Sequence, residues 1–382
     1  MSQPSACLEQ KTGHNKYMAK FVSPPLSKRA VNRSGEKIAD KLADHDDILL
    51  VDQWRASHAY VLNTFQIFFK RRIADHDRDI EFAQRLKRRN TIIDKLQRRN
   101  EKGDRLIGDV TSMQDFAGCR LIFSDMHKLN SFREFLHSSE KMRSVFHVLR
   151  HAEEPDKFNY FESPKWTGYR GIHEVFIHRP RPHRKGEDVA KPWRNLLCEI
   201  QYRTRIQHAW ATALEISDFL DGERTKFALQ EDDLNPRVNF FRLVSELLAR
   251  YHENAAHAIP ELSINDLRNQ IRDLDANLGI MGRLRAMRAV EDFPQLKRHN
   301  VLNVVMGRGG EPTLEVFVFN NSVDAIEKSQ ELESSSESLN AVYVASDRPA
   351  ELRKAYKNYF NDPLDFVELV TQALNEPRLT EG

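Results

Sequence analysis

Two acidic side chains in the middle of the chain, Asp115 and Glu199, could hold a cation for phosphate chemistry. Phosphoryl or pyrophosphoryl transfer needs a hard cation held by carboxylates, positive groups around the phosphates and a base near the attacking hydroxyl. Magnesium suits this pair, because it takes only one or two protein carboxylates and completes its shell with water and phosphate oxygens. Each acid taken singly is more typical of a surface. Glu199, however, stands in an otherwise apolar segment, where a charge is costly unless it is paired.

An aromatic ring and several polar side chains lie close to these acids in the sequence. Tyr169 follows Gly168 in a loop of small residues, which predicts an open ring face on which a base could stack. Strand alternation places some of the neighbouring polar residues on one face, namely His173, Gln201 and Arg203. For His173 and His208 a hydrogen-bonded structural role is an equal alternative. Metal ligation by histidine is disfavoured, because no paired histidine spacing with a Cys or carboxylate partner occurs.

A basic segment upstream, residues 70–105, could bind a polyanion. The pattern predicts a helix over residues 79–100, in which Arg88, Thr91 and Lys95 share one face at spacings of three and four. Arg85 and Lys87 would lie one turn earlier on the same helix. Such a row of basic residues could bind a triphosphate. A solvent-exposed basic face or a nucleic-acid-binding surface has the same pattern.

Composition predicts a soluble chain with more than one folding unit. Its 382 residues exceed a typical single domain, and no apolar run approaches the roughly 20 residues that a membrane span needs. The first twenty residues lack the apolar core of a secretory signal, so we expect a cytoplasmic protein. Cys7, Cys119 and Cys198 are too few and too scattered for a disulfide framework or a structural zinc cluster.

Strands and helices must alternate around the candidate residues to position them. We expect an unstructured tail over residues 1–34 and a helix over 48–72 that begins at the cap Asp47. Periodicity then predicts four strands and two helices, with strands at 118–125, 144–151, 171–180 and 195–204 and helices at 126–139 and 205–220. The fold class is therefore α+β, a mixed β-sheet flanked by helices, over residues 35–220.

The remainder of the chain has a different pattern of predicted elements. Residues 221–295 are predicted to be helical, with one long helix over 223–260 and a second over 267–287 behind a cap made by Ser263 and Asp266. Residues 296–382 are predicted to be a small α+β domain, whose role is packing, oligomerisation or regulation. Its elements are a hairpin over 302–319 turning at Gly309 and Gly310, a helix over 322–335, a strand over 340–346 and two final helices.

Four short motifs together resemble the synthetase domain of the RelA/SpoT family, the ATP:GTP pyrophosphotransferases that make (p)ppGpp. The resemblance covers roughly residues 48–220. Within the family it is greatest to members that lack the hydrolase domain, because the residues before position 48 are too few to form that domain. Each motif is weak alone, but four in the family's order make a specific signal. They are RLKRRNTIIDKL, MQDFAGCRLI, KWTGYRGIH and EIQYRTRIQHAW. The resemblance implies a nucleotidyltransferase-like fold.

The resemblance also implies a role for each matching residue. Asp115 and Glu199 would hold Mg²⁺, and Glu199 would act as the general base. Its support would come from Gln201, Arg203 and His208. Tyr169 would stack on the acceptor base. The residues implied to bind ATP are Arg85, Lys87, Thr91 (in place of the family's usual serine), Lys95 and Arg120. The residues implied to bind the acceptor are Lys165, Tyr169, His173, Gln201, Arg203 and His208.

The function implied is transfer of the β,γ-pyrophosphate of ATP to the ribose 3′-hydroxyl of GDP or GTP. One alternative is toxin-type pyrophosphorylation of the tRNA 3′ end, and another is a non-catalytic alarmone- or RNA-binding module. The sequence departs from the family at Thr167, where Asn is frequent, and at Phe158 and Asn159, which replace a charged pair, so the choice between GDP and GTP stays open. We expect a homo-oligomer, and an antitoxin is a candidate partner.

Overall fold

The computed structural model divides into two compact units. The first unit is Met1–Leu121, Asn130–Phe158 and His173–Tyr202. The second is Ile122–Leu129, Asn159–Ile172 and Arg203–Gly382. The residues that the structure describes are 21–100, 102–138, 147–179, 190–220, 235–255, 257–286, 297, 299–306, 312–335, 338–345 and 364–376.

Helical structure begins earlier than the sequence pattern predicts. Helix α2, Lys28–Ala39, overlaps the segment 1–34 that was expected to be an unstructured tail, so that boundary is wrong. The helix forms because it buries Val31 and Ile38, which are 0% and 4% exposed, against neighbouring elements. Residues 1–20 lie outside the described part of the chain.

Helix α3, His45–His76, starts with a capping box rather than with the predicted cap residue. Asp44 is the N-cap, and its side chain accepts a hydrogen bond from the backbone N–H of Asp47 at 2.9 Å. Asp47 is the third helical residue and also accepts from Ser34 Oγ at 2.7 Å and from Lys37 Nζ at 2.8 Å. Asp47 therefore ties α3 to α2 instead of starting α3.

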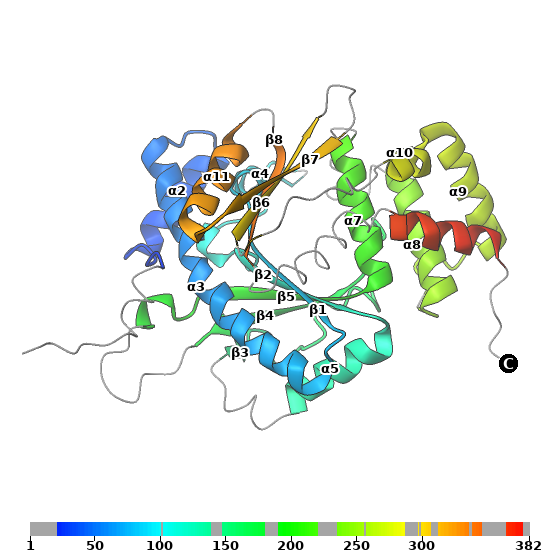
Figure 1. Ribbon diagram of the computed structural model, residues 1–382, viewed down its shortest axis with the longest axis horizontal. Helices are drawn as coiled ribbons and strands as arrows, with labels where there is room; N and C mark the ends of the chain where they lie inside the picture. The colour runs from blue at the N-terminus through cyan, green and yellow to red at the C-terminus, as the bar shows by residue number, and fades with distance from the viewer. Residues whose placement is uncertain are drawn as a thin grey trace, which may run out of the picture. The chain divides into compact units, whose positions relative to one another are not determined.

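A five-stranded mixed sheet forms the centre of the fold, and the predicted α+β class is confirmed. The strands are β1 Glu81–Leu86, β2 Ala117–Phe123, β3 His147–Leu149, β4 Ile172–His178 and β5 Leu197–Thr204, in the order β1-β2-β5-β4-β3. β3 pairs antiparallel with β4. β2 and β5 carry the apolar core, where Leu121, Cys198 and Tyr202 are at most 1% exposed. Helix α5, Met126–Ser138, follows β2, and helix α7, Arg205–Leu220, follows β5, both as predicted (Figure 1).

The helix predicted over residues 79–100 is wrong in its first half. Residues Glu81–Leu86 are the edge strand β1, and only Arg89–Leu96 are helical, as α4. An edge strand can pair on one side and leave polar side chains in solvent, so its composition resembled that of an amphipathic helix. Pairing with β2 decides the conformation. Consequently Arg85 lies on a strand and Lys87 in the connection to α4.

Several helices of the second unit share one hydrophobic core, drawn from α7, α8 Pro236–His252, α9 Ile264–Leu278, α10 Ile280–Ala286 and the helix over 364–375. The capping box of Ser263 and Asp266 is confirmed. The helix predicted over 267–287 is interrupted at Gly279, whose φ of 64° is left-handed. Of the long helix predicted over 223–260, α8 begins only at Pro236, and residues 221–234 lie outside the described part.

A three-stranded antiparallel sheet and one helix confirm the paired hairpin strands, the helix over 322–335 and the strand over 340–346 that were predicted for the C-terminal region. The sheet has the order β7-β6-β8, with β6 His299–Met306, β7 Pro312–Phe319 and β8 Ser338–Ala345, and α11 Ser322–Ser334 contacts all three strands. The predicted turn at Gly309 and Gly310 and the first of the two final helices lie outside the described residues. The helix over 364–375 packs with α8 and α9 through Phe366 and Val370. The domain boundaries at 220 and 295 stay predictions.

Among the described residues, no helix combines the length and the apolar character that crossing a membrane requires.

Candidate functional site

Three charged residues of the first unit form an ion cluster in front of β2. Asp115 precedes the strand by two residues, and its Oδ2 accepts from Lys87 Nζ at 2.7 Å and from Lys95 Nζ at 3.0 Å. The other oxygen, Oδ1, is buried and has no hydrogen-bond partner among the described residues. The cluster therefore offers one carboxylate oxygen and two ammonium groups to a ligand.

The backbone around this cluster explains why its members meet. The N–H of Lys87 donates to the carbonyl oxygen of Phe116 at 2.9 Å, which joins the end of β1 to the start of β2. Arg55 of α3 donates from Nε to the carbonyl oxygen of Lys87 at 2.6 Å. No local pattern in the sequence marks this contact of Arg55. The pairing of β1 with β2 thus brings Lys87 beside Asp115.

Burial and neighbouring charges shift the pKa values of Asp115 and Lys87 in this cluster. Burial would raise the pKa of Asp115, but the charges of Lys87 and Lys95 outweigh it and hold the pKa below its ordinary value. The negative charge of Glu199 acts in the opposite direction on Asp115, so the two carboxylates interact. Burial lowers the pKa of Lys87, and the carboxylate of Asp115 offsets only part of this effect. Asp115 is consequently held in its anionic form.

Glu199 of β5 is held by two side chains of the sheet. Its Oε1 lies 3.1 Å from Nδ1 of His173 on β4, and its Oε2 accepts from Gln201 Nε2 at 2.8 Å. The neighbours Cys198 and Ile200 are fully buried, whereas Glu199 and Gln201 are partly exposed, as strand alternation requires. Burial alone would raise the pKa of Glu199, but His173 and Gln201 hold it well below its ordinary value.

The other residues expected to bind ATP lie on three different elements near Asp115 in the sequence. Arg85 lies on β1 with an exposed side chain, Thr91 lies in the first turn of α4, and Arg120 lies on β2. The charge of Arg85 acts on Lys87, so these two cations are near each other. The row predicted on one helix is therefore divided between a strand, a connection and a helix.

Tyr169 of the second unit is surrounded by two cations and a second tyrosine. Its hydroxyl oxygen accepts from Arg203 Nη2 at 3.0 Å, and the Arg203 guanidinium carbon lies 5.2 Å from its ring centroid. Lys165 Nζ lies 5.3 Å from the same centroid and 4.4 Å from that of Tyr160. The ring predicted to be open is thus flanked by positive charges. Tyr160 went unnoticed in the sequence, because its spacing from Tyr169 fits neither strand nor helix.

The loop that carries Tyr169 has a fixed conformation. Gly168 has φ of 89°, which favours glycine, and its N–H donates to the carbonyl oxygen of Lys165 at 2.8 Å. The N–H of Lys165 donates in turn to the carbonyl oxygen of Tyr169 at 3.1 Å. Thr167 is buried, with 7% of its surface exposed. We call residues 165–170 the acceptor loop, because the motifs implied that Lys165 and Tyr169 bind the acceptor.

His208 and Trp210 lie on α7, which begins directly after β5. His208 is buried, at 6% exposed, and the Trp210 ring lies 6.5 Å from that of Tyr169 at an angle of 61°. Trp210 Nε1 donates to the carbonyl oxygen of Phe241 at 2.9 Å, so the indole joins α7 to α8. Helix α7 therefore supplies the apolar support beside Tyr169.

The residues present suit a hard cation with few protein ligands. Within the described chain, no three His, Cys, Asp or Glu side chains gather into a closed metal site. Two interacting carboxylates, one with an unsatisfied buried oxygen, are the donor set that magnesium uses when phosphate oxygens and water complete its shell.

Fold and charges together define an α+β domain in which a carboxylate paired with two lysines interacts with a second, hydrogen-bonded carboxylate. Residues 84–217 match the RelA_SpoT family model, described as the region found in RelA / SpoT proteins. This part of the chain matches the RelA/SpoT region that the motifs predicted.

Solved structures also show similarity to the chain. Small alarmone synthetase 1 from Bacillus subtilis, bound to its product pppGpp, is 22% identical, with a TM-score of 0.36, over 50% of this chain and 88% of that one. A GTP pyrophosphokinase family protein from Streptococcus pneumoniae is 18% identical, with a TM-score of 0.34, over 57% of this chain and 93% of that one. A comparison with curated proteins finds no significant match.

Proposed function

We propose that the chain transfers the β,γ-pyrophosphate of ATP to the ribose 3′-hydroxyl of GDP or GTP and so makes (p)ppGpp. The observation that carries the proposal is the pairing of Asp115 with Lys87 and Lys95, near an ionised Glu199, inside a RelA/SpoT domain. The two lysines of this cluster suit a negatively charged nucleoside triphosphate better than a neutral substrate. The names of the two solved structures agree with this substrate class.

The donor is ATP, held by the positive groups around Asp115. Lys87 and Lys95 would exchange their contact with Asp115 for phosphate oxygens, and Arg85, Thr91 and Arg120 would complete the donor site. Asp115 and Glu199 would hold Mg²⁺, which neutralises charge on the phosphates when it is bound. In its absence the two lysines neutralise the carboxylate of Asp115 and keep the site from repelling anions.

The reaction forms one bond and breaks one. The acceptor 3′-oxygen attacks the β-phosphorus, the bond from that phosphorus to the oxygen bridging it to the α-phosphorus breaks, and AMP leaves with that oxygen. Glu199 would take the proton of the 3′-hydroxyl. Its hydrogen bonds keep it ionised and fixed in direction, although they also weaken it as a base, so positioning must carry much of the rate.

His173 takes a different place in this proposal from the one that the motifs implied. Both His173 and Gln201 were expected to contact the acceptor, and Gln201 was also expected to support Glu199; both hydrogen-bond Glu199. We therefore assign them to holding the base. On the acceptor side, Tyr169 would stack on the guanine, and Lys165, Arg203 and His208 would contact the nucleotide.

An AMP-release assay with a panel of acceptors tests the proposal. Purified protein is incubated with Mg²⁺, ATP labelled in its γ-phosphate and either GDP, GTP or bulk tRNA. We expect AMP and a labelled guanosine nucleotide. Label at the tRNA 3′ end would instead establish the toxin-type alternative. ATP binding without AMP release for any acceptor would establish the non-catalytic alternative. The homo-oligomer, the antitoxin and the cytoplasmic location stay predictions.

A further inference from the structure

The acceptor loop is fastened to helix α8, which lies outside the region that matches the family model. Ser245 of α8 donates from Oγ to the carbonyl oxygen of Gly168 at 2.5 Å, and its side chain is buried. A Cβ added at Gly168 would lie 2.9 Å from Ser245 Cβ and 3.1 Å from Arg242 Cα. The loop backbone therefore touches the helix at van der Waals distance, with no room for a side chain between them.

A buried ion pair makes the second attachment. Arg170, at the end of the acceptor loop, donates from Nη2 to Glu246 Oε2 at 2.9 Å, and the two residues are 4% and 1% exposed. Glu246 also accepts from Arg250 Nε at 2.6 Å and from the backbone N–H of Ala258 at 3.0 Å. Both oxygens of this buried carboxylate accept hydrogen bonds, so α8 holds one side of the Arg170 guanidinium, while Nη1 of Arg170 donates to the carbonyl oxygen of Phe161 at 3.3 Å.

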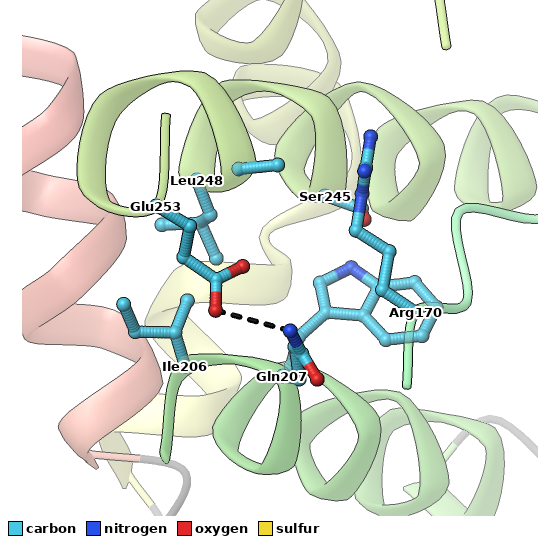
Figure 2. A pocket seen from close by; sticks show the side chains of 8 residues that line it. Arg170, Ile206, Gln207, Ser245, Leu248 and Glu253 are labelled. Carbon is cyan, nitrogen blue, oxygen red and sulfur yellow. Dashed lines mark hydrogen bonds between the residues drawn. The ribbon is translucent and has the colours of Figure 1, made fainter. Parts of the chain in front are cut away.

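Little space remains behind the loop. A cavity of about 10 Å³, roughly the room for one water, is lined by Arg170, by Gln207 and Trp210 of α7 and by α8. Figure 2 shows Arg170 and Ser245 on one side of it and the hydrogen bond from Gln207 to Glu253 on the other. The loop thus rests on a filled interface and cannot settle inward without repacking α7 or α8.

We propose that α8 is the positioning element of the acceptor loop, and that Ser245 and Glu246 set the affinity for the acceptor nucleotide. The proposal rests on the proposed function, since the loop carries Lys165 and Tyr169 for that acceptor. Both residues act through the loop and touch no substrate. Changes at these positions should therefore alter acceptor binding and leave ATP binding unchanged.

Ser245→Ala provides the test, with Ser57→Ala as its matched control. Ser57 is also buried and donates its hydroxyl to a backbone carbonyl, that of Trp54 at 2.6 Å, but it lies on α3. Calorimetry measures the affinity of the full chain for GDP and for a non-hydrolysable ATP analogue. Hydrogen exchange measures the amide exchange rate of residues 164–171. We expect Ser245→Ala to weaken GDP binding about two- to tenfold, the range for one lost hydrogen bond, and to speed exchange in that segment. Ser57→Ala should do neither.

Glu246→Gln is a second variant, expected to act in the same direction with a larger loss of thermal stability, because it leaves Arg170 and Arg250 without their buried counter-charge. Unchanged exchange in Ser245→Ala, or equal loss of GDP and ATP-analogue binding, overturns the inference. If the native protein binds no GDP, the proposed function fails and with it the claim about acceptor affinity. The exchange result then still decides whether α8 holds the loop.

Discussion

His173 and Glu199 form the contact that defines the state of the candidate base: Nδ1 of His173 lies 3.1 Å from Glu199 Oε1. The two residues come from neighbouring strands, β4 and β5, so sheet order brings them together. Apart from burial, which acts in the opposite sense, His173 is the first cause that holds the pKa of Glu199 below its ordinary value. A carboxylate held in this way is ionised at neutral pH.

Removing the histidine should move the acid limb of the pH–rate profile. In His173→Leu the pKa of Glu199 rises, so the base becomes protonated at a higher pH and kcat falls off earlier on acidification. His173→Asn, whose amide nitrogen is near the position of Nδ1, should shift the limb less. The measurement is kcat for AMP release between pH 4 and 9. Coincident acid limbs for the native and Leu proteins would contradict the role of this contact.

Neutralising the base should affect chemistry more than binding. Glu199→Gln is expected to lower single-turnover AMP release on the order of a hundredfold or more, because the amide cannot accept the hydroxyl proton. Acceptor affinity should change little. Glu331→Gln, which changes an exposed carboxylate on α11 that pairs with Lys328, is the control and should retain activity. Full turnover in Glu199→Gln would remove this residue as the base.

Substituting the acceptor-loop glycine should strain the backbone and push against α8. Gly168→Ala places a Cβ at 2.9 Å from Ser245 Cβ on a backbone with φ of 89°, so we expect a stability loss of about 1–3 kcal/mol and weaker GDP binding. Gly282→Ala is the control, since its Cβ meets nothing within 4 Å and it lies in helix α10. That change should be neutral or stabilising by up to about 1 kcal/mol. Chemical denaturation of both proteins measures the difference, and equal effects would count against the tight contact.

Three buried histidines should make the first unit sensitive to acid. Burial lowers the pKa of His58 to about 4, of His147 to about 3 and of His178 to about 4. Each folded pKa lies below the unfolded value, so the unfolded chain binds more protons at acidic pH. The stability these groups supply is complete above pH about 6.5 and is lost as pH falls toward the folded values, by up to about 1.4 kcal/mol per pH unit and histidine.

A variant isolates one of these groups. His147 stacks on Phe65 with ring centroids 4.2 Å apart, so His147→Phe keeps an aromatic ring there and removes the titration. The loss of unfolding free energy between pH 7 and pH 5, from urea denaturation, should be smaller in this variant than in the native protein. An identical loss would show that the ring of His147 is not the group that titrates.

Local signals in the sequence were sufficient where a segment's own residues decide its structure. The capping box at Ser263 and Asp266, the extent of α7 and the apolar strands β2 and β5 were predicted because caps, periodicity and burial are written in neighbouring positions. The RelA/SpoT domain was also predicted, because four motifs in order are more specific than any one of them.

Contacts between distant segments required the tertiary structure. Residues 81–86 were predicted as helix, but pairing with β2 makes them a strand and brings Lys87 to Asp115. The sequence singled out His173 and Glu199 but not the contact between them, because a hydrogen bond between strands leaves no mark in local spacing. It likewise identified Tyr169 but not Ser245 and Glu246, which hold its loop from 77 and 76 residues away. Residue types and their order determined which chemistry was available, and strand pairing and helix packing decided which side chains meet to perform it.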